Sequence, residues 1–215
     1  MCLTPEESMA TVVDEHFPDN RDAPHVNILP RGTVTEVDTS DSKADFMSDE
    51  RVKEAIRTFG PHKAPGPDGF KPCVYQNFGD KATTRLVSLY KASYLLGYVP
   101  KIWRLSKVIF LPKPGKADYS QARAFRPITL APFVIKAMER TVLWYIEEQH
   151  LGTNPLHCNQ HAFRKGKSTE SALTDFVSKV EKALAKREHA LGVCLDIQGA
   201  FDNVKSQAVI QGMEA

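Results

Sequence analysis

The stretch LDIQGAFD, residues 195–202, decides which fold and chemistry this chain is expected to have. It overlaps the end of the apolar run 190–195, which has the length of a buried strand, and it places the carboxylate of Asp196 directly after that run. A carboxylate at the end of a buried strand is held rigidly at the rim of a sheet, where it suits a hard cation such as Mg²⁺. Taken alone, however, two aspartates spaced like Asp196 and Asp202 more often mark only a strand end and the turn that follows.

The residues between the two aspartates suit a nucleotide site. Gly199 and Ala200 are small enough for a triphosphate to approach backbone N–H groups, and Phe201 would then stand over the nucleotide sugar. Nucleotidyl transfer needs two divalent ions roughly 4 Å apart. Because Asp196 alone cannot hold two ions, the chemistry would require further carboxylates.

Outward from this stretch, the sequence alternates between helix and strand patterns. Capping residues and apolar stripes predict helices over residues 48–59, 80–96, 132–149 and 168–187. Their expected buried side chains are Val52, Ile56 and Phe59 in the first, Leu86, Leu89, Tyr90 and Tyr94 in the second, and Leu173, Phe176, Val177, Val180 and Leu184 in the last. The run 108–111 predicts a second buried strand, with a loop over 117–126 after it. This mixture predicts an α/β (α+β) fold.

Charge divides the chain into two parts. Residues 1–50 hold 12 acidic and 3 basic side chains, whereas residues 51–215 hold 14 acidic and 25 basic ones. We expect residues 1–47 to be an acidic, partly disordered linker with room for one short helix, and the folded domain to cover residues 48–215. A basic domain suits binding to nucleic acid, since phosphate neutralisation supplies most non-specific affinity. A solvated basic surface explains the charge equally well.

Two further features of the composition concern the compartment. No apolar run approaches the roughly 18 residues that a membrane span needs, and the N-terminal residues lack the pattern of a secretory signal. The cysteines Cys2, Cys73, Cys158 and Cys194 show no Cys-x-x-Cys spacing. We therefore expect an intracellular protein with free thiols and no membrane association. The pattern His157-Cys158-x-x-His161 lacks a second pair of ligands, which favours ordinary loop and core residues over a zinc site.

Five motifs occur in an order that is typical of one family. They are KAPGPDGF at residues 63–70, VIFLPKPGK at 108–116, FRPITL at 125–130, NQHAFRKGKST at 159–169 and LDIQGAFD at 195–202. Together they resemble the reverse transcriptases of non-long-terminal-repeat retrotransposons, with the greatest likeness to jockey-like and related elements. The resemblance covers about residues 50–205, and the His-Phe-Pro at 16–18 looks like the segment that joins endonuclease and polymerase in such elements.

The resemblance implies an RNA-directed DNA polymerase, of which this chain carries the fingers and the first part of the palm of a right-hand fold. The implied site residues are, for catalysis and metal binding, Asp196 with the main-chain carbonyl of Ile197, and, for binding of the deoxynucleoside triphosphate, Lys113, Arg126, Gly199, Ala200 and Phe201. Phe201 looks like a steric gate that excludes a ribose 2′-hydroxyl by a clash. Without the family, the basic run 101–126 is more often a solvated face.

The same resemblance implies contacts with template and primer and a set of partners. The implied nucleic-acid contacts are Lys63, Gln160, Phe163, Arg164, Ser168 and Thr169, with Ala162 standing where many relatives carry glycine. The complete enzyme would use two Mg²⁺ (or Mn²⁺) ions, an RNA template, a DNA primer and deoxynucleoside triphosphates. An upstream endonuclease and a downstream thumb are expected, in a ribonucleoprotein of the nucleus and cytoplasm.

The end of the chain carries its own expectation. Only 13 residues follow Asp202, and they contain no Tyr/Phe-x-Asp-Asp box. We therefore expect a polymerase cut before its catalytic hairpin and thumb, with no primer extension by this chain alone. The alternative is a non-catalytic nucleic-acid-binding remnant of such an element. Coding sequence beyond Ala215 would discriminate the two, because the first alternative requires an in-frame Tyr/Phe-x-Asp-Asp box downstream.

Overall fold

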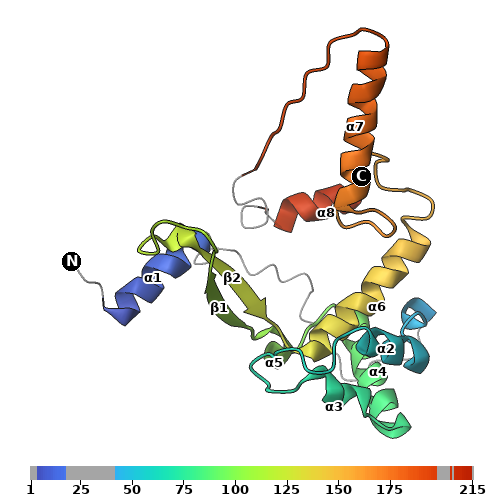
Figure 1. Cartoon of the computed structure of the whole chain (residues 1–215). Helices are drawn as coiled ribbons and strands as arrows, with labels where there is room; N and C mark the ends of the chain where they lie inside the picture. The colour runs from blue at the N-terminus through green and yellow to red at the C-terminus, as the bar shows by residue number, and fades with distance from the viewer. Residues whose placement is uncertain (1–3, 18–41, 198–203, 205, 215) are drawn as a thin grey trace. The chain divides into compact units, whose positions relative to one another are not determined.

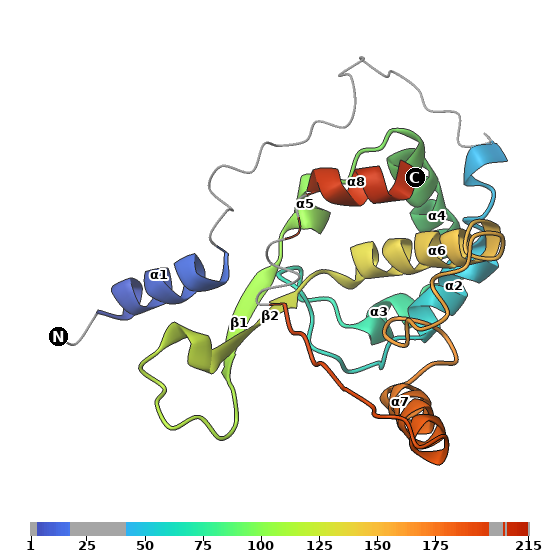
Figure 2. The same cartoon turned by 90° about the horizontal axis from the view of Figure 1, so that it is seen from above.

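The fold is a mixture of helices and one small sheet in two compact units, residues 1–148 and 149–215. It is seen in a computed structural model that describes residues 4–17, 42–197, 204 and 206–214 (Figures 1 and 2). The expectation of an α+β class is consistent with this mixture. Among the described residues the two longest helices, α6 and α7, have 17 residues each. No helix in that part of the chain is both long and apolar enough to cross a membrane.

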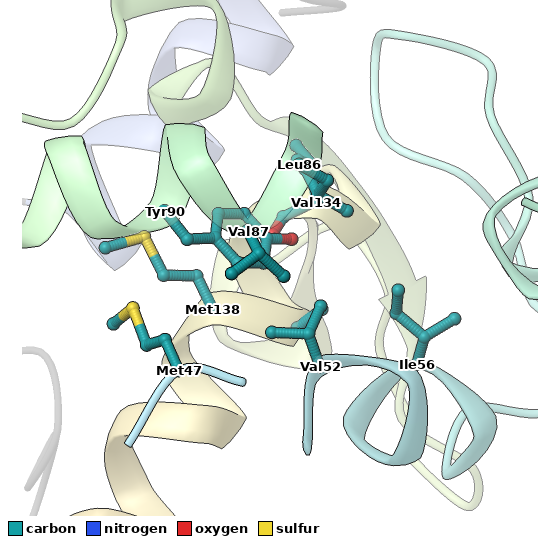
Figure 3. Packing of buried hydrophobic residues seen from close by; sticks show 9 residues of the cluster. Met47, Val52, Ile56, Leu86, Val87, Tyr90, Val134 and Met138 are labelled. Carbon is teal, nitrogen blue, oxygen red and sulfur yellow. The ribbon is translucent and has the colours of Figure 1, made fainter. Parts of the chain in front are cut away.

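The core of the first unit lies between three helices. These are α2 (Asp49–Arg57), α4 (Asp80–Leu95) and α6 (Phe133–Gln149). Figure 3 shows their buried side chains converging, namely Val52 and Ile56 from α2, Leu86, Val87 and Tyr90 from α4, and Val134 and Met138 from α6. Burying one such side chain stabilises a fold by roughly 1.5–3 kcal/mol relative to exposing it. The three helices therefore stabilise one another through this shared core.

The packed core begins before position 48. Ala44, in the short 3₁₀ helix η1 (Ser42–Ala44), and Met47 are both fully buried at 0% exposure. The Ser48 hydroxyl then accepts a hydrogen bond from the Arg51 backbone N–H at 3.2 Å, which confirms Ser48 as the cap of α2. The buried residues before Ser48 and the cap at Ser48 together fix the position of the start of α2 against the core.

Helix α4 matches its expected range but not its expected face. Leu86 and Tyr90 are buried and Tyr94 packs against the core, as the sequence predicts. Leu89 is 56% exposed, so its expected burial is wrong, and Val87 takes the inner position instead. Side chains three and four residues apart share a helix face, and the stripe that runs through positions 83, 86, 87 and 90 leaves position 89 outside.

Two short helices close the ends of this core. Helix α3 (Pro72–Gln76) brings the Gln76 amide to the last turn of α2, where it donates to the carbonyls of Ile56 at 3.2 Å and Phe59 at 2.8 Å. The Ile56 carbonyl also accepts from the Phe59 backbone N–H at 3.2 Å, so the Gln76 amide adds a side-chain cap to the last turn of α2. Helix α5 (Lys101–Arg104) places Trp103 edge-on to Tyr90, with ring centroids 5.7 Å apart.

A two-stranded hairpin extends from the core of the first unit. Strand β1 (Lys107–Pro112) pairs antiparallel with β2 (Phe125–Leu130), and the 3₁₀ helix η2 (Ala122–Ala124) precedes β2. The sequence predicted the first strand as buried, but Val108, Ile109 and Leu111 are exposed. The second strand was not predicted at all. Within the described residues no third strand joins this ribbon, so much of its surface stays in solvent.

Helix α1 (Pro5–His16) lies within the segment that was expected to be a linker. Thr4 and Glu7 form a capping box at its start, with the Thr4 hydroxyl accepting from the Glu7 N–H at 3.2 Å and the Glu7 carboxylate accepting from the Thr4 N–H at 2.8 Å. The helix contacts η2 at the tip of the hairpin (Figure 1).

The second unit contains α7 (Thr169–Ala185) and α8 (Ser206–Glu214). Ser168 caps α7 as predicted, but the expected inward face of that helix is exposed, with Leu173 at 62% and Leu184 at 60%. The run 190–195 was expected to be a buried strand. In the described residues it is extended but unpaired, and Leu191 and Leu195 are 91% and 90% exposed. Strand burial requires neighbouring strands, which the described part of this unit lacks.

The loop 63–70 is packed against the start of α6 through a glycine. A Cβ added to Gly66 would lie 2.6 Å from the Pro132 nitrogen, which is backbone that cannot simply rotate away. Gly66→Ser is therefore expected to lower the free energy of unfolding by about 1–3 kcal/mol, measured by urea denaturation. The matched control is Gly79→Ser, because a Cβ there meets nothing within 4 Å and serine suits this helix cap. Equal losses from both variants would contradict the predicted clash.

Candidate functional site

Lys113 and Arg126 lie on one face of the hairpin. Leu111 is paired with Arg126 in the register, and residues paired directly across an antiparallel ribbon share a face. The Lys113 backbone N–H donates to the Ala124 carbonyl at 2.8 Å, which continues the ladder one step beyond the strand. Lys113 is thus a diagonal neighbour of Arg126 on the same face, at a spacing of roughly 7–8 Å. The structure brings these two predicted residues together.

The Lys113 ammonium is fixed by one hydrogen bond and keeps further N–H donors for a ligand. Its Nζ donates to the Arg123 main-chain carbonyl at 2.7 Å, and the Tyr119 hydroxyl donates to the Lys113 carbonyl at 2.8 Å. The side chain is half-buried. An ammonium group has three N–H donors, so two remain for an anionic ligand. A partly fixed cation of this kind loses less freedom on binding than a fully solvated lysine.

Arg126 presents its guanidinium to solvent. The side chain is exposed, and no residue in the described part of the chain forms an ion pair with it. A guanidinium offers five N–H donors in a planar fork, which matches the oxygens of a phosphate. The side chains around it on this face are apolar and partly exposed, namely Ile109 at 37%, Leu111 at 50% and Ile128 at 40%. At this end of the hairpin the face therefore combines the Lys113 and Arg126 cations with neighbouring apolar side chains.

The hairpin loop adds positive charge at its tip. Lys116 and Arg123 lie close to Lys113 in the chain, and Asp118 is the acidic residue between them. The Ser120 backbone N–H donates to the Asp118 carboxylate at 2.8 Å, and this bond is the main reason that the pKa of Asp118 lies below its usual value. Asp118 stays ionised, and its carboxylate accepts hydrogen bonds from Ser120 and Gln121 in the same turn.

Lys63 lies in a loop whose shape is fixed by its own polar groups. The Asp68 carboxylate accepts from the Phe70 N–H at 3.3 Å and from the Tyr75 hydroxyl at 3.2 Å. Burial, followed by the neighbouring Asp68 charge, raises the pKa of Tyr75, so the hydroxyl remains a donor. Gly66 in this loop closely approaches the chain's own Pro132, while the Lys63 side chain is exposed.

The motif at 159–169 forms a compact turn before α7. Gln160 Nε2 donates to the Ala162 carbonyl at 3.3 Å, and Arg164 Nη1 donates to the His157 carbonyl at 3.1 Å. Phe163 has a φ of 56°, in the left-handed region that bulky residues rarely adopt, and its ring is 85% exposed. The turn thus presents an aromatic ring to solvent. The motif identified Phe163, but its unusual backbone could not be inferred from the sequence.

The start of α7 is supported by residues that the sequence did not assign to the site. Ser168 Oγ accepts from the Ser171 N–H at 3.2 Å, and Thr169 follows as the first, exposed residue of the helix. The His161 ring lies with Nδ1 2.9 Å from Ser171 Oγ and Nε2 3.8 Å from Asp175 Oδ2. The side chain of His161 is only 13% exposed. It therefore ties the turn to the helix, a role that its place in the motif alone did not reveal.

The predicted metal ligands lie in the second unit, on the extended segment 191–197. Asp196 and Ile197 are exposed, and a Cβ at Gly192 would lie 3.3 Å from the Phe176 ring, so the segment runs close to α7. The Asp196 carboxylate and the Ile197 carbonyl have the donor chemistry that a hard divalent ion prefers. In the part of the chain that is described, no three His, Cys, Asp or Glu side chains gather around one point. Gly199, Ala200 and Phe201 lie outside the described residues.

Comparison with known proteins gives a consistent result. Residues 111–215 match the family described as reverse transcriptase (RNA-dependent DNA polymerase). The RNA-directed DNA polymerase from mobile element jockey of Drosophila funebris is 34% identical over 161 residues, which are 75% of this chain and 18% of that protein. The jockey protein of Drosophila melanogaster is 32% identical over 155 residues, 72% of this chain and 17% of that protein.

A further relative comes from another element. The Pol polyprotein of the type-1 retrotransposable element R1 of Bradysia coprophila is 29% identical over 160 residues, 74% of this chain and 16% of that protein. This chain therefore spans less than a fifth of the length of the curated relatives described here.

Proposed function

This chain belongs, through residues 111–215, to the reverse transcriptase (RNA-dependent DNA polymerase) family, and on that premise we propose that its hairpin binds the triphosphate of an incoming nucleotide. The whole protein would be the RNA-directed DNA polymerase of a non-long-terminal-repeat retrotransposon. In it, the first unit would serve as fingers and the segment around Asp196 as the beginning of the palm.

One observation carries this proposal. Lys113 and Arg126 share a face of the hairpin, and each has N–H donors that are not used by the described part of the chain. A nucleoside triphosphate carries several negative charges close together, and phosphoryl-transfer proteins bind such groups mainly by positioned cations. The ammonium provides a point charge and the guanidinium a planar fork. Their diagonal spacing allows the two cations to contact different phosphate groups of one triphosphate.

The chemistry would require divalent ions on the second unit. Asp196 and the Ile197 carbonyl would hold one Mg²⁺ or Mn²⁺, and two ions would be bound in the complete enzyme. A bound ion of this kind activates the attacking hydroxyl and neutralises the leaving pyrophosphate. By family resemblance, Gly199 and Ala200 would lie along the nucleotide and Phe201 would exclude ribonucleotides.

Template and primer would contact two exposed loops. In the first unit Lys63 would contact a backbone phosphate, and in the second unit the turn of Gln160, Phe163 and Arg164 would contact a nucleic-acid strand. The exposed Phe163 ring supports this proposal, because base–aromatic stacking is a common device for holding single strands. Ser168 and Thr169 would add contacts at the start of α7. The full-length protein would act with an endonuclease and a thumb in a ribonucleoprotein of the nucleus and cytoplasm.

The proposal is tested by the dependence of binding on phosphate number. The 215-residue chain is titrated with a deoxynucleoside, its monophosphate and its triphosphate at low and high salt. The triphosphate is expected to bind about tenfold more tightly than the monophosphate, and its affinity should fall as salt screens the two cations. A nucleoside that binds as tightly as its triphosphate, or affinity that ignores salt, would contradict binding through the hairpin cations.

A further inference from the structure

We propose that helix α1 is a positioning element that holds the Lys113 ammonium in place through η2, so that triphosphate affinity depends on residues near the start of the chain. The inference rests on the proposed function, since it assigns α1 a part in the same site. Neither the sequence motifs nor the family match assigns α1 such a role, because α1 lies before residue 111, where the family match begins.

The first connection is an ion pair between α1 and the hairpin tip. Glu15 Oε1 and Arg123 Nε are 2.5 Å apart, a charge-assisted hydrogen bond between groups 108 residues apart in the chain. The Glu15 side chain is 36% exposed and that of Arg123 is 69% exposed. Solvent screens such a pair, so its value lies in fixing geometry rather than in adding much stability.

The second connection is made by the last residue of the same helix. The His16 Nε2 lies 3.2 Å from the Ala122 carbonyl, and since a carbonyl only accepts, this nitrogen carries the proton. The His16 ring also packs against Phe110, with centroids 5.8 Å apart. Successive strand residues point to opposite faces, so Phe110 lies on the face opposite Leu111 and its partner Arg126. Helix α1 thus supports the hairpin from behind and leaves the cationic face open.

The same short turn then contacts Lys113 twice. The Arg123 carbonyl accepts from Lys113 Nζ at 2.7 Å, and the Ala124 carbonyl accepts from the Lys113 backbone N–H at 2.8 Å. Residues 122–124 therefore connect α1 on one side with both the backbone and the ammonium of Lys113 on the other. A single 3₁₀ turn is weakly stable by itself, and the two contacts from α1 restrict its movement. Loss of α1 docking would let the ammonium move before a ligand arrives, which weakens binding.

The proposal is tested with Glu15→Gln, and with Glu6→Gln as the matched control on the same helix. Two quantities are measured in the full chain: the hydrogen-exchange rate of the Lys113 backbone amide and the dissociation constant for a deoxynucleoside triphosphate. Glu15→Gln is expected to speed exchange and to weaken triphosphate binding roughly fivefold through lost preorganisation. Glu6→Gln, which keeps the Arg123 pair, is expected to change neither.

A second variant tests whether Glu15→Gln acts only by unfolding helix α1. Arg123→Gln breaks the same pair from the hairpin side, and the double variant should speed exchange no further than Glu15→Gln does, since coupled residues are non-additive. Unchanged exchange in Glu15→Gln overturns the proposal, and so does faster exchange with unchanged triphosphate affinity. Absence of triphosphate binding by the unmodified chain overturns the proposed function, while the exchange rates still decide whether α1 holds the tip.

Discussion

Replacing Tyr90 with alanine is expected to lower the free energy of unfolding of the first unit by about 3–5 kcal/mol. Tyr90 is fully buried at 0% exposure, and its hydroxyl donates to the Val134 carbonyl at 2.5 Å. Burial raises the pKa of Tyr90, so the hydroxyl keeps its proton and remains a donor. The ring also meets Trp103 edge-on at 5.7 Å. One side chain therefore joins α4, α5 and α6, and its removal leaves a cavity where they meet.

Urea denaturation followed by tryptophan fluorescence measures this loss, since Trp103 is one of the tyrosine's neighbours. The matched control is Leu89→Ala, one residue earlier on the same helix, where the side chain is 56% exposed. That change is expected to cost about 0.5 kcal/mol or less. Tyr90→Phe keeps the ring and is expected to cost about 1 kcal/mol for the lost hydrogen bond. A larger loss at Leu89 than at Tyr90 would contradict the orientation of α4.

Replacing either hairpin cation is expected to weaken triphosphate binding by about tenfold, and replacing both by up to about a hundredfold. Each change removes charge-assisted hydrogen bonds to phosphate, and neither side chain holds the core together. Arg126→Ala should also reduce the salt dependence of binding, because one cation no longer contributes. The affinities are measured by calorimetry with Lys113→Ala, Arg126→Ala and the double variant.

The matched control for these changes is Lys107→Ala. Lys107 lies in β1 on the same face, but at the other end of the strand, where it pairs with Leu130. The Lys107→Ala substitution therefore removes the same positive charge, but roughly 20 Å away from Lys113. If Lys107→Ala weakened triphosphate binding as much as Lys113→Ala, binding would depend on the overall positive charge of the hairpin and not on a site formed by Lys113 and Arg126.

The helices of the first unit could be predicted because their signals are local. Ser48 caps its helix through a bond to a residue three positions away, and the apolar spacing of Val52 and Ile56 follows the helical repeat. The face of α4 was harder to predict. Leu89 and Val87 are both apolar, and only their packing against α2 and α6 decides which one is buried.

The strands were predicted less well because their burial depends on distant partners. FRPITL contains a proline and an arginine and has no clear alternation, yet it pairs with β1 along its whole length. Pro127 is tolerated because an edge strand has backbone N–H groups that need no partner. The run 190–195 has every local property of a buried strand, but the described residues offer it no partner.

The motifs indicated candidate residues for the site, and their roles stay predictions. The contacts that hold the tip of the hairpin in place could not be predicted from the sequence. Lys113 and Arg126 were both identified, and the register places them on one face. The contacts of Glu15 and His16 with η2 join segments more than 100 residues apart, as shown by the separations of 108 and 106 positions. No local pattern reports such contacts. The role of Asp196 stays a prediction.

The most direct test of triphosphate binding by the hairpin is NMR of the lysine and arginine side-chain nitrogens during titration with a deoxynucleoside triphosphate. We expect the Lys113 Nζ and Arg126 Nε signals to shift at the same ligand concentration, while the Lys107 signal stays unchanged. Saturable shifts confined to other cations, with Lys113 and Arg126 unmoved, would contradict triphosphate binding by the hairpin.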